Sequence, residues 1–430
     1  MTSFFKGVLY NMSLLDLHKN IGTAKDNRNN PIHDWYRFTA GFSYKLVQKI
    51  IEIENLGPDD CIYESFAGCG TTLVSAQKHG IKAIGNEGQE LLYNVIKGKL
   101  NWSVNIDTIK QVIIGLEKNI FEGKYQKPYH KLLETLYSKN DLYQLYFIRD
   151  YIIETVKDED VTTFLNLALT QSLHKVSIHP IAIPYISRSK TLNNSLSAFD
   201  TFKNTVFKMI EDLGTVIDKP ITTEIYFHDS RQQNTFIEDN SCTICITSPP
   251  YLNNLDYGEV SKVCSHFFGF TNDWSEITEK VRKNLVTGAT THYKESEFDL
   301  EAWKEGEFYL HNKEVIDNIL PDIARIEAIS KTRKGKKSFH ILALYYFEDM
   351  YQVFLEMKRV LSSGSKAYLV LGDSAPYGVF IDTTRILGEI AKNCGFNKYS
   401  IVKIRERGTK WQSLTYRHNV KLSENILVLE

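Results

Sequence analysis

The chain has 430 residues, 43% of them hydrophobic and 24% charged, which is the composition of an ordinary globular protein. This length suits one large catalytic domain with insertions, or two domains. The 51 basic and 52 acidic residues leave a net charge of −1, so any contact with nucleic acid has to come from local patches. No run approaches the ~18 apolar residues that span a bilayer. Because the first residues also lack a signal-peptide pattern, we expect a cytoplasmic protein without membrane segments.

The six cysteines are scattered along the chain in mostly apolar surroundings, as reduced buried thiols are. Cys242 and Cys245 form a C-x-x-C pair. Residues three apart on a strand point to opposite faces, so these two are not expected to share a metal or a disulfide. No second such pair or nearby pair of histidines completes a zinc site. The sequence predicts no metal.

The first clear pattern lies before residue 73. Residues 32–43 are rich in aromatic side chains, and residues 46–53 have the spacing of an amphipathic helix. Residues 60–72 then indicate a strand, a glycine-bearing turn and the start of a helix. Gly68 and Gly70 allow positive φ and let the backbone approach a ligand closely. A helix that begins near Thr71 would present free N–H groups to a carboxylate.

A second strand is predicted at residues 81–87, and it ends in an acid. Glu87 would accept hydrogen bonds from the two hydroxyls of a ribose, as an acid does at this position in dinucleotide-binding folds. A nucleotide-dependent oxidoreductase would require the spacing G-x-G-x-x-G. This chain has G-x-G-T-T at residues 68–72, so we discount that class.

Helical spacing dominates residues 101–219, which interrupt the alternation of strands and helices. We expect a largely helical insertion there. Within it, residues 177–190 are punctuated by prolines and contain aromatic and basic side chains. Arg188 and Lys190 in this loop are candidates for contacts with a phosphate backbone. The alternative is a solvated connection between two helices.

The alternating pattern resumes with a strand at residues 221–227 and a turn that contains Asp229. A short apolar strand at residues 242–246 is then followed by Thr247, Ser248, Pro249, Pro250 and Tyr251. Two consecutive prolines end a strand because neither has an N–H to donate to the ladder. The result is a rigid turn that suits the carboxyl edge of a parallel sheet, where open α/β folds bind their ligands.

This proline turn fits one specific chemistry. The amino group on a cytosine or adenine ring is a poor nucleophile because its lone pair is delocalised into the ring. Acceptors that hold its two hydrogens, here the Ser248 side chain and the Pro249 carbonyl, would draw the nitrogen towards a tetrahedral, nucleophilic state. Tyr251 would offer a π-face to a base taken out of its stack. The alternative is an ordinary Pro-Pro turn at the end of a strand.

A second insertion is expected from about residue 259 to residue 341. It ends in the most concentrated positive charge of the chain, with Arg333, Lys334, Lys336 and Lys337 as candidate phosphate contacts. Such contacts weaken steeply with salt; a solvated basic loop is the alternative. The remaining elements predicted are a helix at 345–361 that stops at 362–364, a buried strand at 367–372, a helix at 381–394, and an antiparallel pair formed by 400–405 and 424–429.

Together these segments resemble the amino-methylating DNA methyltransferases, which transfer a methyl group from S-adenosylmethionine. That family pairs a cofactor loop like D-P-F-x-G-x-G-T-T with a catalytic loop [S/D/N]-P-P-[Y/F]. Here the two loops are residues 64–72 and 248–251, with Glu64 and Ser65 in place of the commoner Asp-Pro. The resemblance covers about residues 31–103, 221–258 and 342–430, and it leaves both insertions outside.

The resemblance implies an α/β fold: a doubly wound, mostly parallel, Rossmann-like sheet with an antiparallel closing hairpin and two insertions, the first largely helical. Residues 1–103 would form an N-terminal arm and the cofactor-binding half of the catalytic domain. Residues 104–220 would be the helical insertion, a candidate for target recognition, and residues 221–258 the catalytic-loop region. Residues 259–341 would be the second insertion, a candidate for DNA contact, and residues 342–430 the C-terminal half.

The resemblance also implies roles for individual residues. The segment before the cofactor loop would pack against the methionine end of the cofactor, with His33, Tyr36 and Phe42 as candidates, and Asp229 would lie near its adenine ring. The expected partner is double-stranded DNA with a flipped target base, and a cognate restriction endonuclease is a candidate partner whose presence the sequence does not decide. The predicted catalytic residues are Ser248, Pro249, Pro250 and Tyr251; the predicted S-adenosylmethionine contacts are Tyr36, Glu64, Phe66, Gly68, Gly70, Thr71, Thr72, Glu87 and Asp229.

The methylated base stays open. Ser-Pro-Pro-Tyr is commoner among the cytosine members of the family and Asp-Pro-Pro-Tyr among the adenine members, so we favour the cytosine amino group, although both residue types offer an oxygen acceptor. Methylation of ring carbon five is disfavoured because it needs a cysteine nucleophile, and the catalytic loop has none. A non-catalytic DNA-binding or partner subunit and an RNA methyltransferase are the alternatives. The intact loops argue against the first, and the lack of a recognisable RNA-binding appendage argues against the second.

Overall fold

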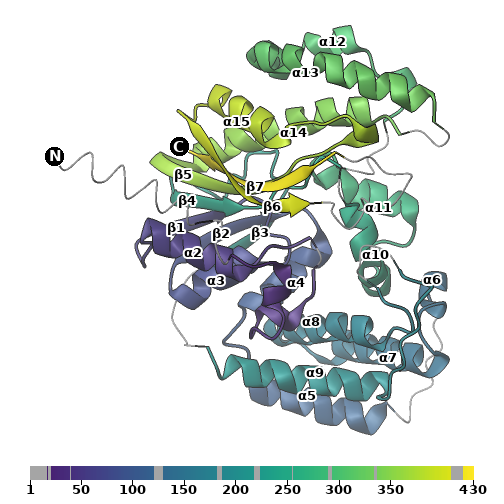
Figure 1. The fold of residues 1–430 in the computed structure, drawn as a ribbon. Coiled ribbons are helices and arrows are strands. Elements are labelled where there is room, and N and C mark those ends of the chain that lie inside the picture. Colours follow the sequence, from purple (N-terminus) through teal and green to yellow (C-terminus); the bar gives the residue numbers. More distant parts are fainter. Residues whose placement is uncertain are drawn as a thin grey trace.

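A computed structural model describes Leu17 and residues 21–38, 40–120, 129–181, 186–216, 223–253, 255–288, 293–333, 337–407 and 420–430. Its centre is a seven-stranded sheet in the order β3-β2-β1-β4-β5-β7-β6 (Figure 1). Within the described ranges, β7 alone runs against the others, between β5 and β6. The strands are β1 (Cys61–Glu64), β2 (Lys82–Glu87), β3 (Thr223–Phe227), β4 (Cys242–Thr247), β5 (Leu361–Gly372), β6 (Tyr399–Arg407) and β7 (Leu422–Leu429).

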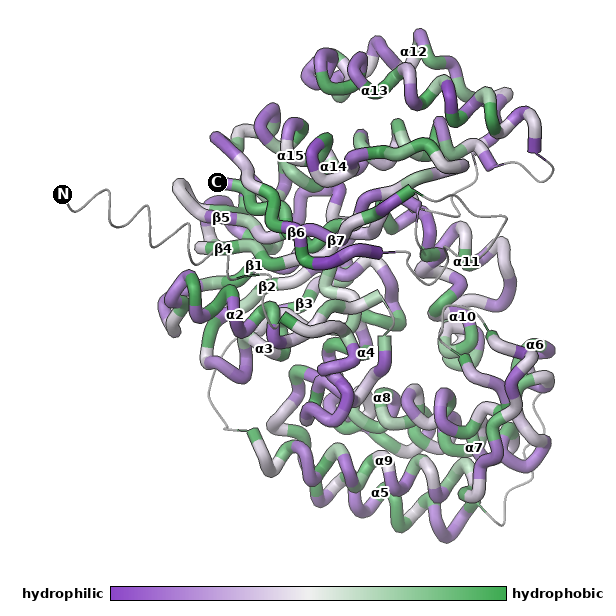
Figure 2. The backbone as a smooth tube through the Cα atoms, in the orientation of Figure 1, coloured by the Kyte–Doolittle hydropathy of each residue, from purple (hydrophilic) through white to green (hydrophobic). Residues whose placement is uncertain are grey.

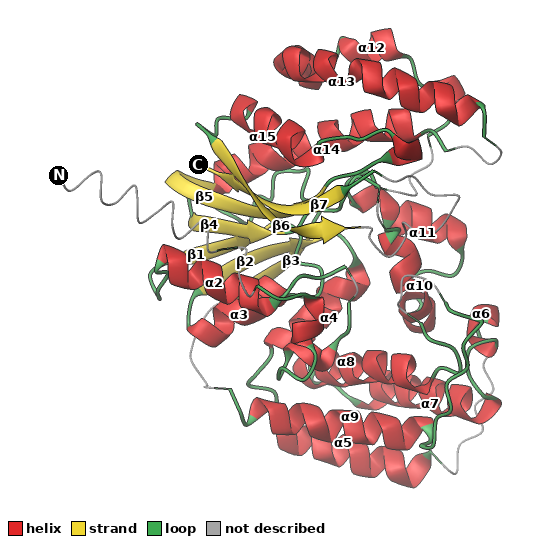
Figure 3. Ribbon diagram, in the orientation of Figure 1, coloured by secondary structure: helices red, strands yellow, loops and turns green. Residues whose placement is uncertain are grey.

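Helices cover both faces of the sheet (Figure 3). Successive strand residues point to opposite faces, so Ile244 packs with α2 (Tyr44–Glu54) and α3 (Thr71–His79), whereas Cys245 packs with the helices of the other face. Those helices are α14 (Phe339–Val360) and α15 (Thr383–Asn393). The central strands β1 and β4 are therefore buried along almost their whole length, and Figure 2 shows hydrophobic positions both in the strands and on the helices around them.

The first insertion is a layer of helices below the sheet in Figure 1. It packs on α4 (Glu90–Leu100) and on the N-terminal arm. Trp35 of the arm is fully buried, and its Nε1 donates to Asp212 Oδ2 at 2.8 Å. The prediction of a largely helical insertion is confirmed. Its helices are α5 (Ile106–Asn119), α6 (Lys131–Glu134), α7 (Lys139–Thr155), α8 (Glu159–Val176) and α9 (Ala198–Leu213).

The second insertion is also helical where it is described. It contains α10 (Tyr257–Phe268), α11 (Trp274–Lys280), α12 (Leu300–Lys304) and α13 (Glu307–Lys331). Helix α13 packs on α14 and α15, on the sheet face away from the first insertion (Figure 1). In the parts of the chain that the structure describes, no helix is long and apolar enough to cross a membrane.

The predicted fold class is confirmed, with differences at element ends. Strand β5 begins at Leu361, six residues before the strand that we expected. Leu361 already pairs with Cys242, and the Ser362 hydroxyl donates to the Cys242 carbonyl at 2.9 Å, so the Ser-Ser-Gly segment continues the ladder through a register shift. The last long helix begins earlier as well, at Phe339 rather than at residue 345.

The strand order reverses between β1 and β4, which places a switch point at the carboxyl edge of the sheet. Open α/β sheets bind ligands outside the strand ends at such a point, because the loops leave in opposite directions and open a crevice. Four parallel strands end here. They lead into Ser65 after β1, Gly88 after β2, Asp229 after β3 and Ser248 after β4.

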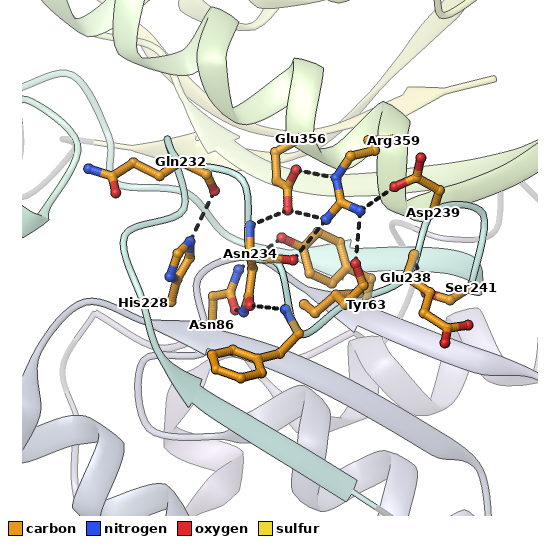
Figure 4. A network of polar contacts seen from close by, with 12 residues as sticks. Tyr63, Asn86, His228, Gln232, Asn234, Glu238, Asp239, Ser241, Glu356 and Arg359 are labelled. Atoms are coloured by element: carbon orange, nitrogen blue, oxygen red, sulfur yellow. Dashed lines mark hydrogen bonds and ion pairs between the residues drawn. The ribbon is translucent and has the colours of Figure 1, made fainter.

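A buried polar network joins this edge to the end of α14 (Figure 4). The Arg359 guanidinium pairs with Glu356 at 2.7 Å and donates to the Asn234 carbonyl at 3.1 Å. The backbone N–H of Asn234 donates to Glu356 Oε1 at 2.9 Å, and its side-chain amide donates to Asn86 Oδ1 at 2.9 Å. Since Asn86 belongs to β2, the network ties the two halves of the sheet together.

Replacing Arg359 with methionine is expected to lower the free energy of unfolding by about 3–5 kcal/mol, because the Glu356 carboxylate would stay buried without its partner. Chemical denaturation at neutral pH measures the change. The matched control is Arg325→Met: Arg325 is 69% exposed and pairs with Asp322 at 3.5 Å, so its loss should cost less than about 1 kcal/mol. Equal losses in the two variants would contradict this account of the network.

Candidate active site

A cavity that is open to solvent lies at the switch point. Of the residues predicted from the sequence to bind a cofactor, Phe66, Gly68, Thr71, Glu87 and Asp229 line its wall. Ser248 and Pro250 of the proline turn line the same wall. The structure thus brings together two loops that lie far apart in the sequence.

Two buried carboxylates hold the glycine turn that follows β1. Glu64 accepts hydrogen bonds from the backbone N–H of Phe66 at 3.0 Å and from the Thr72 hydroxyl at 2.6 Å. Burial raises the pKa of Glu64 to about 8. Gly68 and Gly70 both have positive φ, at 57° and 80°, in the region that favours glycine. Glu64, Gly70 and Thr72 lie outside the cavity wall, so they shape the turn from behind.

Glu87 stands at the end of β2, on the cavity wall. Its carboxylate accepts from the backbone N–H of Gly68 at 2.7 Å and of Gln89 at 2.8 Å. Burial raises its pKa to about 7, although these two bonds favour the charged form. A carboxylate has about four acceptor positions. Glu87 therefore keeps capacity for hydroxyl groups of a ligand.

Asp229 faces the cavity with its charge already paired. Arg231 donates Nε to Asp229 Oδ1 at 3.0 Å and Nη2 to Oδ2 at 2.6 Å, which is a bidentate ion pair. The same guanidinium contacts Asp349 of α14 at 3.3 Å and donates to the Lys283 carbonyl. Arg231 thereby joins the cavity wall to both α14 and the second insertion.

Residues 282–288 of the second insertion form a strap across the cavity, which Asn284, Leu285 and Val286 help to line. Two contacts fix the strap. Arg282 pairs with the buried Asp256 at 2.6 Å, and the Thr287 N–H donates to Asp349 Oδ2 at 2.7 Å. The strap lies so close to the end of β2 that a Cβ on Gly88 would overlap the Asn284 carbonyl oxygen.

The N-terminal arm closes another side of the cavity. Phe38 and Phe42 line it, whereas Tyr36 does not. The Tyr36 ring is buried against His174 of α8, with ring centroids 5.5 Å apart, so this predicted cofactor contact instead packs the arm onto the first insertion. His33 is likewise buried, and desolvation together with the charges of Lys78 and Lys99 holds its pKa well below the ordinary value.

The proline turn is held by three different elements. The Ser248 hydroxyl donates to the Val370 carbonyl of β5 at 3.2 Å. The Tyr346 hydroxyl of α14 donates to the Pro250 carbonyl at 2.9 Å. This bond does not involve the neighbouring Pro249 carbonyl. Tyr251 donates to Glu424 of β7 at 2.9 Å. Because a hydroxyl has one proton, Ser248 Oγ can only accept hydrogen bonds from any further partner.

The basic residues predicted to contact DNA lie on two separate insertions. Arg188 and Lys190 follow α8 in the first insertion, where Arg188 donates to the Thr135 hydroxyl at 3.3 Å. Arg333 follows α13 and stacks over the Tyr377 ring at 5.1 Å, next to Lys337, whose backbone N–H donates to the Tyr377 hydroxyl. Lys334 and Lys336 fall outside the described residues.

Comparison with known proteins finds several relatives of this chain. No family model matches the chain. The chain is 22% identical to type II methyltransferase M.BsoBI of Geobacillus stearothermophilus, over 96% of this chain and 88% of that protein. It is 23% identical to type II methyltransferase M.AvaI of a Nostoc species and 20% identical to M.MvaI of Kocuria varians, each over 90% of this chain and over 83% and 85% of those proteins. This chain is a relative of the type II methyltransferases.

The residues of the cavity fit the methyl donor S-adenosylmethionine. Gln89 lines the wall, and its side-chain oxygen is buried without a hydrogen-bond partner, so it is an acceptor that lacks a donor. Glu87 adds a second acceptor beside it, and Phe38, Phe42 and Phe66 supply apolar surface. The described residues contain no cluster of His, Cys, Asp or Glu that could hold a metal ion.

Sequence reasoning missed several residues of the cavity wall. Gln89 could have been found from the sequence, because it follows Glu87, the acid at the end of the predicted strand, by two residues. Phe38 lies in the aromatic arm, where no periodicity tells which ring faces a ligand. Asn284, Leu285 and Val286 had no signal, because only the folding of the second insertion brings the strap to the site.

Replacing Glu87 with glutamine is expected to lower the affinity for S-adenosylmethionine by at least about tenfold, because a charged acceptor is lost. The wild-type affinity should rise as the pH passes upward through about 7, where the carboxyl ionises, and the variant should lose this dependence. Calorimetric titration below and above that pH measures both effects. Equal affinities of the two proteins would contradict the assigned role.

The same substitution has a second consequence, in the protein without cofactor. Burial raises the folded-state pKa from 4.5 to about 7, so the folded state binds this proton more tightly than the unfolded state does. Glu87 therefore lowers the stability progressively as the pH rises from about 4.5 to about 7. The wild type should lose stability relative to Glu87→Gln across that window, as measured by denaturation at several pH values.

Replacing Gly88 with alanine is expected to push the strap away from the end of β2. The new Cβ meets backbone, which cannot rotate away, and overpacking costs about 1–3 kcal/mol. The affinity for S-adenosylmethionine should therefore fall roughly tenfold. Gly57→Ala is the matched control, since nothing lies within 4 Å of its added Cβ. Unchanged binding in Gly88→Ala would show that the strap does not close the cavity.

Proposed function

We propose that this protein transfers a methyl group from S-adenosylmethionine to the exocyclic amino group of cytosine in DNA, with the target base flipped out of the duplex. One observation carries the proposal. Ser248 lies on the wall of the cavity and donates its only proton to the Val370 carbonyl, which supports a role for its oxygen as an acceptor for an incoming amino group. The relationship to type II methyltransferases supports the same conclusion.

The chain's own residues would activate the amino nitrogen. Ser248 Oγ and the Pro249 carbonyl would accept its two hydrogens, which draws the lone pair out of the ring and towards the methyl group. S-adenosylmethionine would supply that group as an electrophilic methyl on a sulfonium: the sulfur–carbon bond would break as the nitrogen–carbon bond forms, the neutral thioether would leave, and the amino nitrogen would lose one proton to solvent. Glu87 and Gln89 would orient the donor, and the rigid Pro249 and Pro250 would hold the acceptors in place.

The adenine amino group is the alternative acceptor, because the same pair of oxygens would hold its hydrogens equally well. We favour cytosine because the loop has serine at its first position, as in the Ser-Pro-Pro-Tyr loops of the cytosine enzymes that this sequence resembles. Such an enzyme would act in the cytoplasm, where the DNA lies, beside a restriction endonuclease of the same specificity.

The two insertions are the proposed DNA-binding parts. Arg188, Lys190, Arg333 and Lys337 would contact phosphates, which positions the duplex without reading its sequence. Residues 104–220 and 259–341 would then share the recognition of the target site. Helices α10 and α14 cross the edges of the second range, so this insertion is built into the catalytic core.

The proposal predicts transfer of labelled methyl from S-adenosylmethionine to unmethylated DNA. Mass spectrometry of the digested nucleosides should find the label in N4-methylcytosine. Ser248→Ala should reduce the rate at least about 100-fold, the usual effect of removing one group that stabilises developing charge. Tyr251→Ala should reduce it as well, because the stacking partner of the base is lost.

Other outcomes are informative. Label in N6-methyladenine would keep the mechanism and change the base. Label in neither base, with S-adenosylmethionine still bound, would exclude DNA methylation by this chain alone and favour a non-catalytic role or an RNA substrate. Full activity in Ser248→Ala would exclude the role given to its hydroxyl.

A further inference from the structure

The ring of Tyr251 is in contact with the two C-terminal strands, β6 and β7. Its hydroxyl donates to Glu424 Oε1 of β7 at 2.9 Å, and the guanidinium of Arg407 on β6 lies over the ring at 4.7 Å from its centroid. Glu424 also forms an ion pair with Arg405 of β6. Burial and the Glu424 charge raise the pKa of Tyr251 well above the ordinary value, so the phenol keeps the proton that it donates.

The pairing of β6 with β7 places these side chains together. The register shifts between Lys403 and Arg405, so that Arg405, and not Ile404, lies opposite Glu424. Cross-strand partners share a face of the sheet, and residues two apart on a strand do too. The irregularity therefore brings Arg405 and Arg407 to the face of Glu424. Bulges beside active sites commonly re-aim side chains in this way.

The neighbouring strand leaves room for the stacked pair. Gly372 of β5 lies opposite Glu424 in the β5–β7 ladder. A Cβ at Gly372 would overlap Arg407 Nη1 and would come within 2.8 Å of two ring carbons of Tyr251. Glycine at this position is thus required by the contact between the arginine and the tyrosine, since the backbone there has no positive φ to explain it.

We propose that Glu424 and Arg407 are positioning residues for the target base. Glu424 fixes the direction of the Tyr251 hydroxyl, and Arg407 covers one face of the ring, so a flipped base stacks on the opposite face. The ring plane, and with it the amino group in front of Ser248, is set before DNA binds. This inference rests on the proposed base methylation and adds residues that the catalytic loop itself does not contain.

These contacts would pre-organise the Tyr251 side chain. A tyrosine on a loop would otherwise rotate about two side-chain bonds, and a base stacked on it would inherit that freedom. A hydrogen bond to a charged acceptor and a guanidinium stacked on the ring each restrict one rotation. The restriction stabilises the reactive geometry of the base and leaves the cofactor cavity, which Tyr251 does not line, unaffected.

The test is a double-mutant cycle on methyl transfer to DNA. Tyr251→Phe keeps the ring and removes the hydroxyl, and Glu424→Ala removes the acceptor; each should lower kcat about tenfold. If Glu424 acts through the hydroxyl, Glu424→Ala should have little further effect in the Tyr251→Phe background. Glu424→Gln, whose amide oxygen can still accept the bond, should recover most of the activity.

Three further readouts separate positioning from a structural role. S-adenosylmethionine affinity should stay unchanged in these variants, and Glu424→Gln, which keeps an acceptor for the Tyr251 hydroxyl, should keep the thermal stability of the wild type. The fluorescence of 2-aminopurine at the target position should fall in Arg407→Met and Glu424→Ala, because the flipped base is held less firmly. Gly372→Ala should lower kcat in the same way, whereas Gly57→Ala should not, since its new Cβ meets open space.

The outcomes distinguish the two proposals. A wild type that methylates DNA, together with Glu424→Ala effects that are equal in the Tyr251 and Tyr251→Phe backgrounds, would overturn the positioning role alone. Loss of cofactor binding or of stability in Glu424→Ala and Glu424→Gln alike would overturn it too. A wild type that binds S-adenosylmethionine but transfers no methyl group to DNA would overturn the base methylation itself, and the positioning role with it.

Discussion

Two buried carboxylates determine the shape of the active edge. Glu64 ties the start of the glycine turn to α3, and Glu87 ties its middle to the end of β2. Burial raises both pKa values, to about 8 and about 7, and the charge of Glu87 raises that of Glu64 further. The fold thus keeps two acids where ionisation is disfavoured. A local cost of this kind is expected at a functional site, where ligand geometry takes precedence over stability.

The cavity is composite, and each side depends on a different part of the chain. The sheet supplies the floor, and two segments outside the strands supply the rest: the arm at residues 38–42 and the strap at residues 282–288. Trp35 anchors the arm to α9 of the first insertion, and Arg231 anchors the strap to Asp229 and α14. Both insertions are therefore bonded to segments that enclose the proposed cofactor. A displacement of either insertion has to stretch these bonds or carry the enclosing segment with it.

The architecture could be predicted from the sequence because the residues that end its strands act locally. Glycines at 68 and 70 and prolines at 249 and 250 mark where strands end, whatever the rest of the chain does. The exact contacts of the side chains could not be predicted, because they depend on long-range packing. His33, Tyr36 and Phe42 were predicted at the cavity, yet of these three only Phe42 lines it, beside Phe38, since an irregular arm has no period that decides which ring turns inward. A loop motif likewise does not separate Gly68, which lines the cavity, from Gly70 and Thr72, which support the turn from behind.

The two halves of the sheet have different roles. The proposed methyl transfer depends on the boundary between them, the pairing of β1 with β4, which we call the seam. The N-terminal half holds the glycine turn and Glu87, whereas the C-terminal half holds Ser248, Pro250 and Tyr251 through β5, α14 and β7. The halves meet where β1 pairs with β4, with Ile62 opposite Ile244.

One hydroxyl bond crosses this seam beside the cavity, from Ser65 to Thr247 at 3.3 Å. The Thr72 hydroxyl, which donates to Glu64, also lies 3.3 Å from the Ile246 carbonyl across the seam. Methyl transfer needs the donor and the amino nitrogen within van der Waals contact, and a misplacement of about 1 Å can cost 100-fold in rate. The serine and the threonines on either side of the seam therefore matter as much to the proposed chemistry as the residues that would touch the substrates. They set the distance between the two loops.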